Sequence, residues 1–103
     1  MKAIKFVSTP EYELEINKFD KNITYIKKKL ENQFLSQRER NILENELDIA
    51  ETYKNRYVVV TQCEYEIEQL KKMMPDVEIG SDEYREIQHE LDMCEMTIDE
   101  VTL

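Results

Sequence analysis

Few residues in this chain have the chemistry that catalysis or metal binding requires. It contains one histidine, His89, in the tetrapeptide "EIQH", where Glu86 and His89 have the Glu-x-x-His spacing of di-iron helix bundles. Such ligands must point into a bundle, whereas these two residues lie opposite the apolar stripe of the helix predicted here. Because a second copy of the motif is also missing, the sequence predicts no metal site and no cofactor.

The two cysteines, Cys63 and Cys94, lack the CxxC spacing of a redox motif. We expect two small buried thiols in a seam between helices. The alternative is a redox-sensitive cross-link, which requires the two Cα atoms within about 7 Å. A single glycine leaves no Gly-rich phosphate loop, and no base is positioned to activate a serine or threonine. The sequence therefore predicts a protein that is not an enzyme.

Composition predicts the elements that would position these side chains. Over 103 residues, 36% are charged, with one Gly and two Pro, which favours long helices and an all-α domain. We predict one helical domain, 1–103, with helices over 10–34, 37–74 and 82–101. Thr9 and Pro10 mark the first start, Ser36 and Glu39 form a capping box at the second, and Ser81 caps the third. Residues 1–8 are predicted as an extended or disordered arm, with a short strand in "AIKFV" as the alternative.

The stretch "YVVV" at residues 57–60 reads either as a buried strand or as a helix covered on several sides. Antiparallel folding near residue 78 pairs Leu70 with Ile87 and Cys63 with Cys94. Folding near residue 35 pairs the first helix with the start of the second, including Ile16 with Tyr53. A strand at 57–62 would break both registers. We therefore predict two antiparallel helical hairpins around a long central helix. The alternative is a compact three-helix bundle in which the central helix kinks near Asn55.

Four apolar residues of the central helix exceed what the other two helices can cover. Two helical hairpins that share one central helix have thin cores, and a second subunit commonly completes such cores. We therefore expect a homo-oligomer, with a homodimer as the first guess. The predicted self-association residues are Ile42, Ile49, Val58 and Val59.

Charge is distributed unevenly along the chain. The net charge is −9, made up of +3 over residues 1–40, −3 over 41–75 and −9 over 76–103. The third helix carries eight carboxylates in 19 residues, about one per 3.5 Å, close to the roughly 3.4 Å phosphate spacing of a DNA strand. Its predicted partner-binding face comprises Asp82, Glu83, Glu86, Glu90, Met93, Met96 and Glu100.

These features predict a non-catalytic acidic helical interaction module, a small regulator or inhibitor. It would bind a protein partner with a basic surface, such as the nucleic-acid groove of a DNA- or RNA-handling protein, as a nucleic-acid mimic. The alternative is an oligomeric coiled-coil adaptor or scaffold. The cations at 27–29, Arg38 and Arg40 lack interleaved aromatics, so we expect no direct nucleic-acid binding and an attraction to the acidic end of a neighbouring subunit.

The sequence also predicts a location. No window of 18 uncharged apolar residues is present, and "MKAIKFVSTPEYE" lacks the apolar region of a signal peptide. We expect a cytoplasmic protein that does not contact membranes, with both cysteines reduced.

Overall fold

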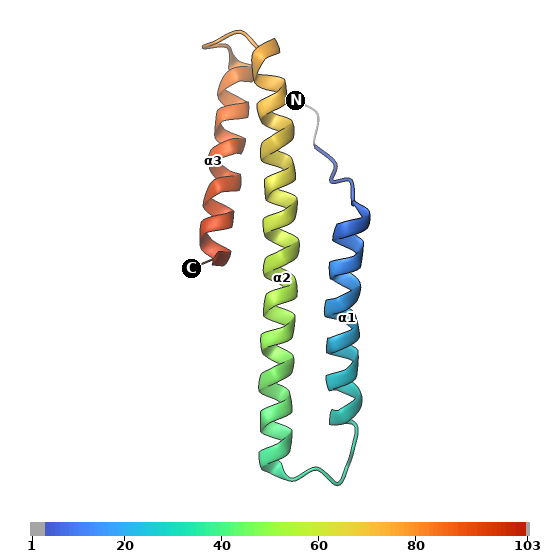
Figure 1. The fold of residues 1–103 in the computed structure, drawn as a ribbon. Coiled ribbons are helices and arrows are strands. Elements are labelled where there is room, and N and C mark those ends of the chain that lie inside the picture. Colours follow the sequence, from blue (N-terminus) through green and yellow to red (C-terminus); the bar gives the residue numbers. More distant parts are fainter. Residues whose placement is uncertain (1–3, 103) are drawn as a thin grey trace. The chain divides into compact units, whose positions relative to one another are not determined.

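A computed structural model of the chain describes residues 4–102 and is all-α in that range. Its elements are α1 (Pro10–Leu30), α2 (Gln37–Met73), a 3₁₀ turn η1 (Met74–Asp76) and α3 (Asp82–Thr102), in that order (Figure 1). Residues 4–9 form neither helix nor strand, so the strand alternative for "AIKFV" fails over its described residues, 4–7. The part of the predicted arm at 1–3 lies outside the described residues.

The helix α1 begins where the sequence predicts and ends earlier. Thr9 is in an extended conformation, and its Oγ1 accepts a hydrogen bond from the Tyr12 N–H at 3.1 Å. The helix ends at Leu30, four residues before the predicted end at 34. Beyond it, the Asn32 side-chain oxygen accepts from the Phe34 N–H at 3.0 Å, which folds the backbone into a turn that competes with helix.

The central helix α2 is helical without interruption over 57–62, so the apolar stretch is helix and not strand. At its start, Ser36 Oγ accepts from the Glu39 N–H and donates to Glu39 Oε1, both at 3.1 Å. It ends at Met73, one residue before the predicted end, because Pro75 belongs to the tighter η1 turn.

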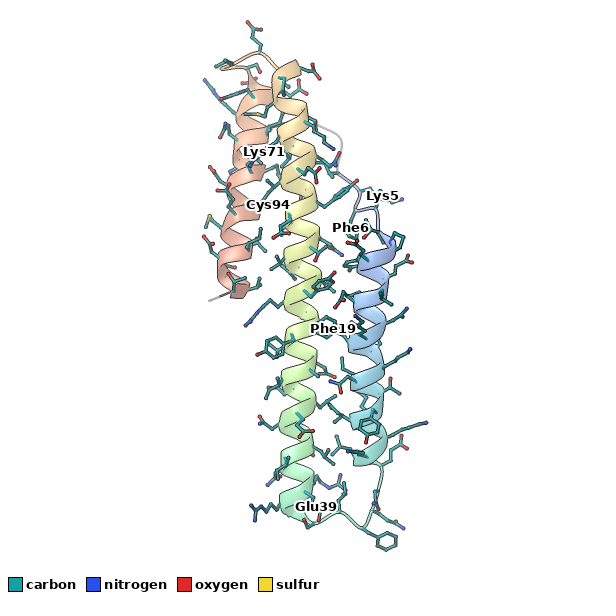
Figure 2. All side chains as sticks on the ribbon, viewed as in Figure 1. Lys5, Phe6, Phe19, Glu39, Lys71 and Cys94 are labelled. Carbon is teal, nitrogen blue, oxygen red and sulfur yellow. The ribbon has the colours of Figure 1, made fainter. Side chains whose placement is uncertain are left out.

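The contacts of the chain divide into two compact units, and the division falls within α2, between Asn55 and Arg56. The first, here the α1 hairpin (residues 8–55), joins α1 antiparallel to the first part of α2 (Figure 1). Its core holds the buried residues Ile23, Ile26 and Ala50, with Leu43 and Leu47 packed against them. Phe19 also points from α1 towards α2 in Figure 2.

Polar contacts join the two helices of the α1 hairpin along its length. Lys54 Nζ lies 2.5 Å from Asp20 Oδ1, and Lys27 Nζ lies 3.8 Å from Glu51 Oε1. Near the turn, the Arg40 guanidinium donates to the carbonyls of Leu30, at 3.2 Å, and Asn32, at 3.3 Å. Arg40 of α2 therefore satisfies the Leu30 carbonyl, which the end of α1 leaves without a helical partner.

The second unit, here the α3 hairpin (residues 4–7 and 56–102), packs α3 antiparallel to the second part of α2. Leu70 and Ile87 have no exposed surface, and Cys94 is buried with them. The ring of Phe6 meets that of Tyr65 edge-on, with centroids 5.3 Å apart, which ties the N-terminal segment to α2. Gly80, with φ of +87°, makes the turn before α3.

No helix within residues 4–102 is both long enough and apolar enough to cross a membrane.

Candidate interaction surfaces

The predicted partner-binding residues of α3 gather on one side of the helix, here called the acidic face. Ile87 and Cys94 turn inward and are buried, so the residues about half a turn away point outward. Met93 is 46% exposed and Met96 56% exposed. Among the carboxylates, Glu90 is only half-buried, at the border of the packed seam. The exposed carboxylates of the face are Asp82, Glu83, Glu86 and Glu100.

The ends of α3 differ in how well they suit its charge. Ser81 Oγ accepts from the Tyr84 N–H at 3.2 Å, and Asp82 and Glu83 occupy the first turn, where a carboxylate is stabilised by the helix dipole. The last turn has no basic residue and carries Asp99 and Glu100, where the dipole disfavours negative charge. Arg85 is the one Lys or Arg in the α3 sequence. The helix therefore leaves most of its charge uncompensated by its own side chains.

The two cysteines meet in the seam of the α3 hairpin as free thiols, Cys63 half-buried and Cys94 buried. Burial is the main cause that raises the pKa of both thiols, and the nearby Glu66 carboxylate raises it further. The Cys94 pKa reaches about 12, and a hydrogen bond from Cys94 partly offsets the rise at Cys63. Because the thiolate is the nucleophile, neither side chain is suited to nucleophilic catalysis at neutral pH.

The Glu86/His89 pair lies on the exposed side of α3. Over residues 4–102, no group of three or more His, Cys, Asp or Glu side chains is placed to hold a metal ion.

The predicted self-association residues fall in both units. In the α1 hairpin, Ile42 is 50% exposed and Ile49 46% exposed, whereas Val58 and Val59 of the α3 hairpin are half-buried. Tyr53, which the sequence register pairs with Ile16 in the core, is instead 54% exposed. At 100° per residue it shares one side of α2 with Ile42 and Ile49. The i, i+7, i+11 spacing of these three residues is the signal that would have placed Tyr53 on this side of α2.

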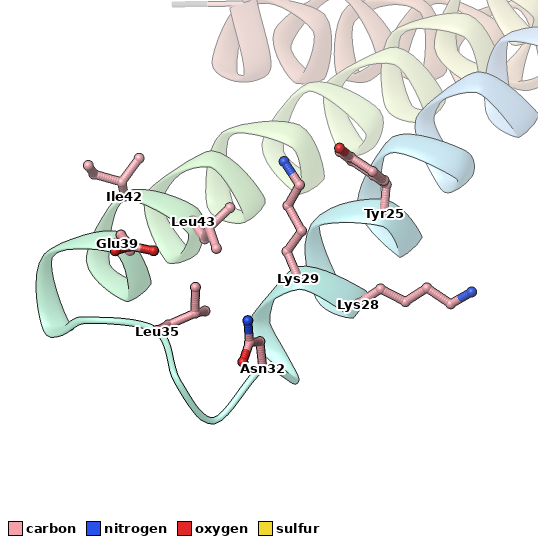
Figure 3. Close-up of a pocket in the computed structure, with 8 residues that line it drawn as sticks. All are labelled: Tyr25, Lys28, Lys29, Asn32, Leu35, Glu39, Ile42 and Leu43. Atoms are coloured by element: carbon pink, nitrogen blue, oxygen red, sulfur yellow. The ribbon is translucent and has the colours of Figure 1, made fainter.

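The α1 hairpin also has an open groove of about 600 Å³ next to its turn, which the sequence analysis did not predict. Figure 3 shows Lys29 rising beside Leu43 and Tyr25, while Lys28 extends away from α2. The Lys29 ammonium lies 4.4 Å from the centre of the Tyr25 ring, a cation–π contact. We call this the basic groove; its lining residues are Tyr25, Lys28, Lys29, Asn32, Leu35, Glu39, Ile42 and Leu43.

Comparisons of the chain with protein-family models, with curated proteins and with solved structures found no match.

Proposed function

We propose that this protein is a non-catalytic acidic interaction module, a small regulator that binds a basic protein surface through the acidic face of α3. The observation that carries the proposal is the pairing of exposed carboxylates with the exposed Met93 and Met96 on one side of a capped helix. Carboxylates attract and orient a cationic partner, and flexible methionines adapt to its apolar surface. Two kinds of contact thus occur on one face.

The partner we propose is the nucleic-acid groove of a DNA- or RNA-handling protein. The carboxylates of α3 follow one another at about the axial spacing of phosphates along a nucleic-acid strand. A groove built to bind phosphates would accept such a helix, and the protein would act as a competitive inhibitor of nucleic-acid binding. The fixed geometry of a helix would make the competition depend on which side of α3 carries the charge.

A defined basic probe tests the acidic face. We expect a fluorescently labelled amphipathic Lys/Leu helical peptide to bind the wild-type chain in a salt-sensitive manner, because exposed charge pairs are screened over about 8–10 Å. Glu86→Lys/Glu100→Lys reverses two exposed carboxylates of the face and should weaken binding by about tenfold or more, measured by anisotropy.

The matched control is Glu44→Lys/Asp48→Lys, which changes net charge equally at exposed positions of the α1 hairpin. It should change the affinity by about twofold or less. Equal loss in both variants would mean that net charge alone attracts the peptide, and the acidic face would be rejected as a site. For the competition itself, proteins captured by the wild type and the control, but not by Glu86→Lys/Glu100→Lys, should be released by duplex DNA.

A second candidate function, an oligomeric adaptor or scaffold, is supported by the exposed side of α2 at Ile42, Ile49 and Tyr53. In this case the apolar stripe would form the interface, and the charge of α3 would only maintain solubility. Ile49→Asp should then abolish assembly, whereas Glu86→Lys/Glu100→Lys should leave it intact. The native mass of the two variants decides between the candidates.

A further inference from the structure

The basic groove continues along α1. A second hollow of about 370 Å³ adjoins it, shares Tyr25 and Lys28 with it, and extends to Asn17 and Lys21. From Asn17 to Asn32, the two hollows follow about 22 Å of helix. The apolar part of this track is Tyr25, Leu35, Ile42 and Leu43, and its cations are Lys21, Lys28 and Lys29. Two carboxylates also line it, and both are engaged within the hairpin: Asp20 pairs with Lys54, and Glu39 accepts from the Ser36 hydroxyl. It therefore has the length and lining to receive one face of an amphipathic acidic helix.

We propose that the basic groove binds the acidic face of α3 from a second copy of this chain. The proposal names a partner for the face on which the proposed function rests. Self-association would then occupy the same carboxylates that a basic partner needs. The two binding events would compete, and only the unassociated chain would be free to act as the regulator.

The chemistry of the two surfaces is complementary. On the donor copy, Met93 and Met96 lie between Glu86 and Glu100, which are 14 residues or about 21 Å apart. On the acceptor copy, Tyr25 lies between Lys21 and Lys29 in α1, and Leu35, Ile42 and Leu43 line the groove from the turn and α2. Methionines would enter the apolar part of the groove, while carboxylates would meet ammonium groups towards its ends.

The charge of the two units favours a second copy as the occupant. By sequence, residues 8–55 hold eight basic and ten acidic residues, for −2, whereas the remaining residues hold six and thirteen, for −7. Three of the eight cations of the less acidic unit, Lys21, Lys28 and Lys29, line the two hollows. Lys27 is engaged by Glu51, while Lys28 and Lys29 are exposed. The chain thus carries both halves of a complementary contact.

Charge reversal tests this contact through the native mass, measured by light scattering over a concentration series at low salt. We expect the mass of the wild type to rise with concentration. Lys28→Glu/Lys29→Glu should stay monomeric because the groove then repels the acidic face, and Glu86→Lys/Glu100→Lys should stay monomeric because its helix meets a lysine groove. The chain that combines all four changes keeps the wild-type net charge and exchanges the two signs. It should recover self-association.

The matched control for the groove is Lys71→Glu/Lys72→Glu. Like Lys28→Glu/Lys29→Glu, it reverses two lysines in the last turn of a helix. The two variants therefore have the same net charge and the same unfavourable interaction with the helix dipole. This control should associate as the wild type does, and circular dichroism should show all variants equally helical. Wild-type association of Lys28→Glu/Lys29→Glu, or a monomeric fourfold variant, would overturn the proposal. So would a wild type that is monomeric throughout.

The inference and the proposed function can fail separately. Lys28→Glu/Lys29→Glu retains an unchanged acidic face, so it should still bind the labelled basic peptide, at least as tightly as the wild type. If it binds the peptide and also self-associates, the groove is rejected as the second-copy site and the proposed function stands. If it stays monomeric and fails to bind the peptide, while the fourfold variant associates, the acidic face serves self-association and the proposed function is rejected.

Discussion

Individual buried side chains matter more than usual in this molecule because each hairpin has so few of them. Leu70 and Ile87 are the largest side chains of the described residues that are fully buried, and they come from the two helices of one unit. A thin core offers little alternative packing when a side chain is truncated, so the lost burial and the cavity both count.

We therefore predict that Ile87→Ala lowers the free energy of unfolding by about 2–5 kcal/mol, the usual range for a buried Ile or Leu. Ile79→Ala removes the same atoms at a position 84% exposed, and should change stability by about 0.5 kcal/mol or less. Urea unfolding followed by far-UV circular dichroism measures both. A similar small effect at both positions would contradict the packing of α3 on α2.

The Cys94 thiol links stability to alkaline pH. Its pKa is raised, mainly by burial, from 9.0 to about 12, so the folded chain holds the proton that the unfolded chain loses. The contribution of this thiol to the free energy of unfolding should be constant below about pH 9. It should fall between about pH 9 and 12, by up to about 1.4 kcal/mol per pH unit.

Cys94→Ala removes this titration. The variant is less stable at neutral pH because it leaves a cavity, but its stability should fall less steeply with rising pH than that of the wild type. The Cys63 thiol, whose pKa burial also raises, is present in both chains, so the slope should lessen without vanishing. Parallel stability curves for the two chains, from urea unfolding at each pH, would refute the linkage.

The sequence predicted buried positions better than exposed ones. Ile87 and Cys94 follow from a regular 3-4 apolar spacing on a helix that can turn only one side inward. The exposure of Tyr53 and the partial burial of Glu90 were not predicted, because both residues lie near the border of an apolar stripe. At a border, a small rotation of the helix decides exposure, and spacing alone does not define that rotation.

At the scale of elements, helix starts are governed by local chemistry. Thr9, Ser36 and Ser81 each accept a hydrogen bond from a backbone N–H three residues later, and each precedes a helix that the sequence predicts. The end of α1 is different, because Arg40, ten residues away, donates to the Leu30 carbonyl. Its contribution depends on the hairpin having formed, so residues near the helix end could not reveal it.

The cap of α2 gives a prediction at this scale. Ser36→Ala removes the acceptor of the Glu39 N–H and should lower the free energy of unfolding by about 1 kcal/mol. Thr97→Ala removes a hydroxyl inside α3 that bonds the Met93 carbonyl, and should be neutral or slightly stabilising because alanine is the better helix former. Thermal unfolding of the two variants provides the comparison, and equal losses would argue against a cap at Ser36.

The whole molecule combines thin cores with concentrated charge, and these two properties lead to different kinds of assembly. Apolar contacts through Ile42, Ile49 and Tyr53 would persist in salt, since screening does not weaken the burial of apolar surface. Contacts through α3 and the basic groove would weaken, because their lysines and carboxylates are exposed. The amphipathic spacing of the sequence predicts both surfaces, but not the groove, which requires side chains of α1, the turn and α2 together.

Salt dependence of the native mass is the prediction that separates these assemblies. We expect the wild-type mass, well above that of one chain at low salt, to fall towards 12.4 kDa as salt is raised to about 1 M, where the screening length is about 3 Å. Lys71→Glu/Lys72→Glu should follow the same curve, because its groove and acidic face are unchanged. A mass that resists salt in the wild type and collapses in Ile49→Asp would instead identify the stripe on α2 as the interface, and the molecule as an adaptor.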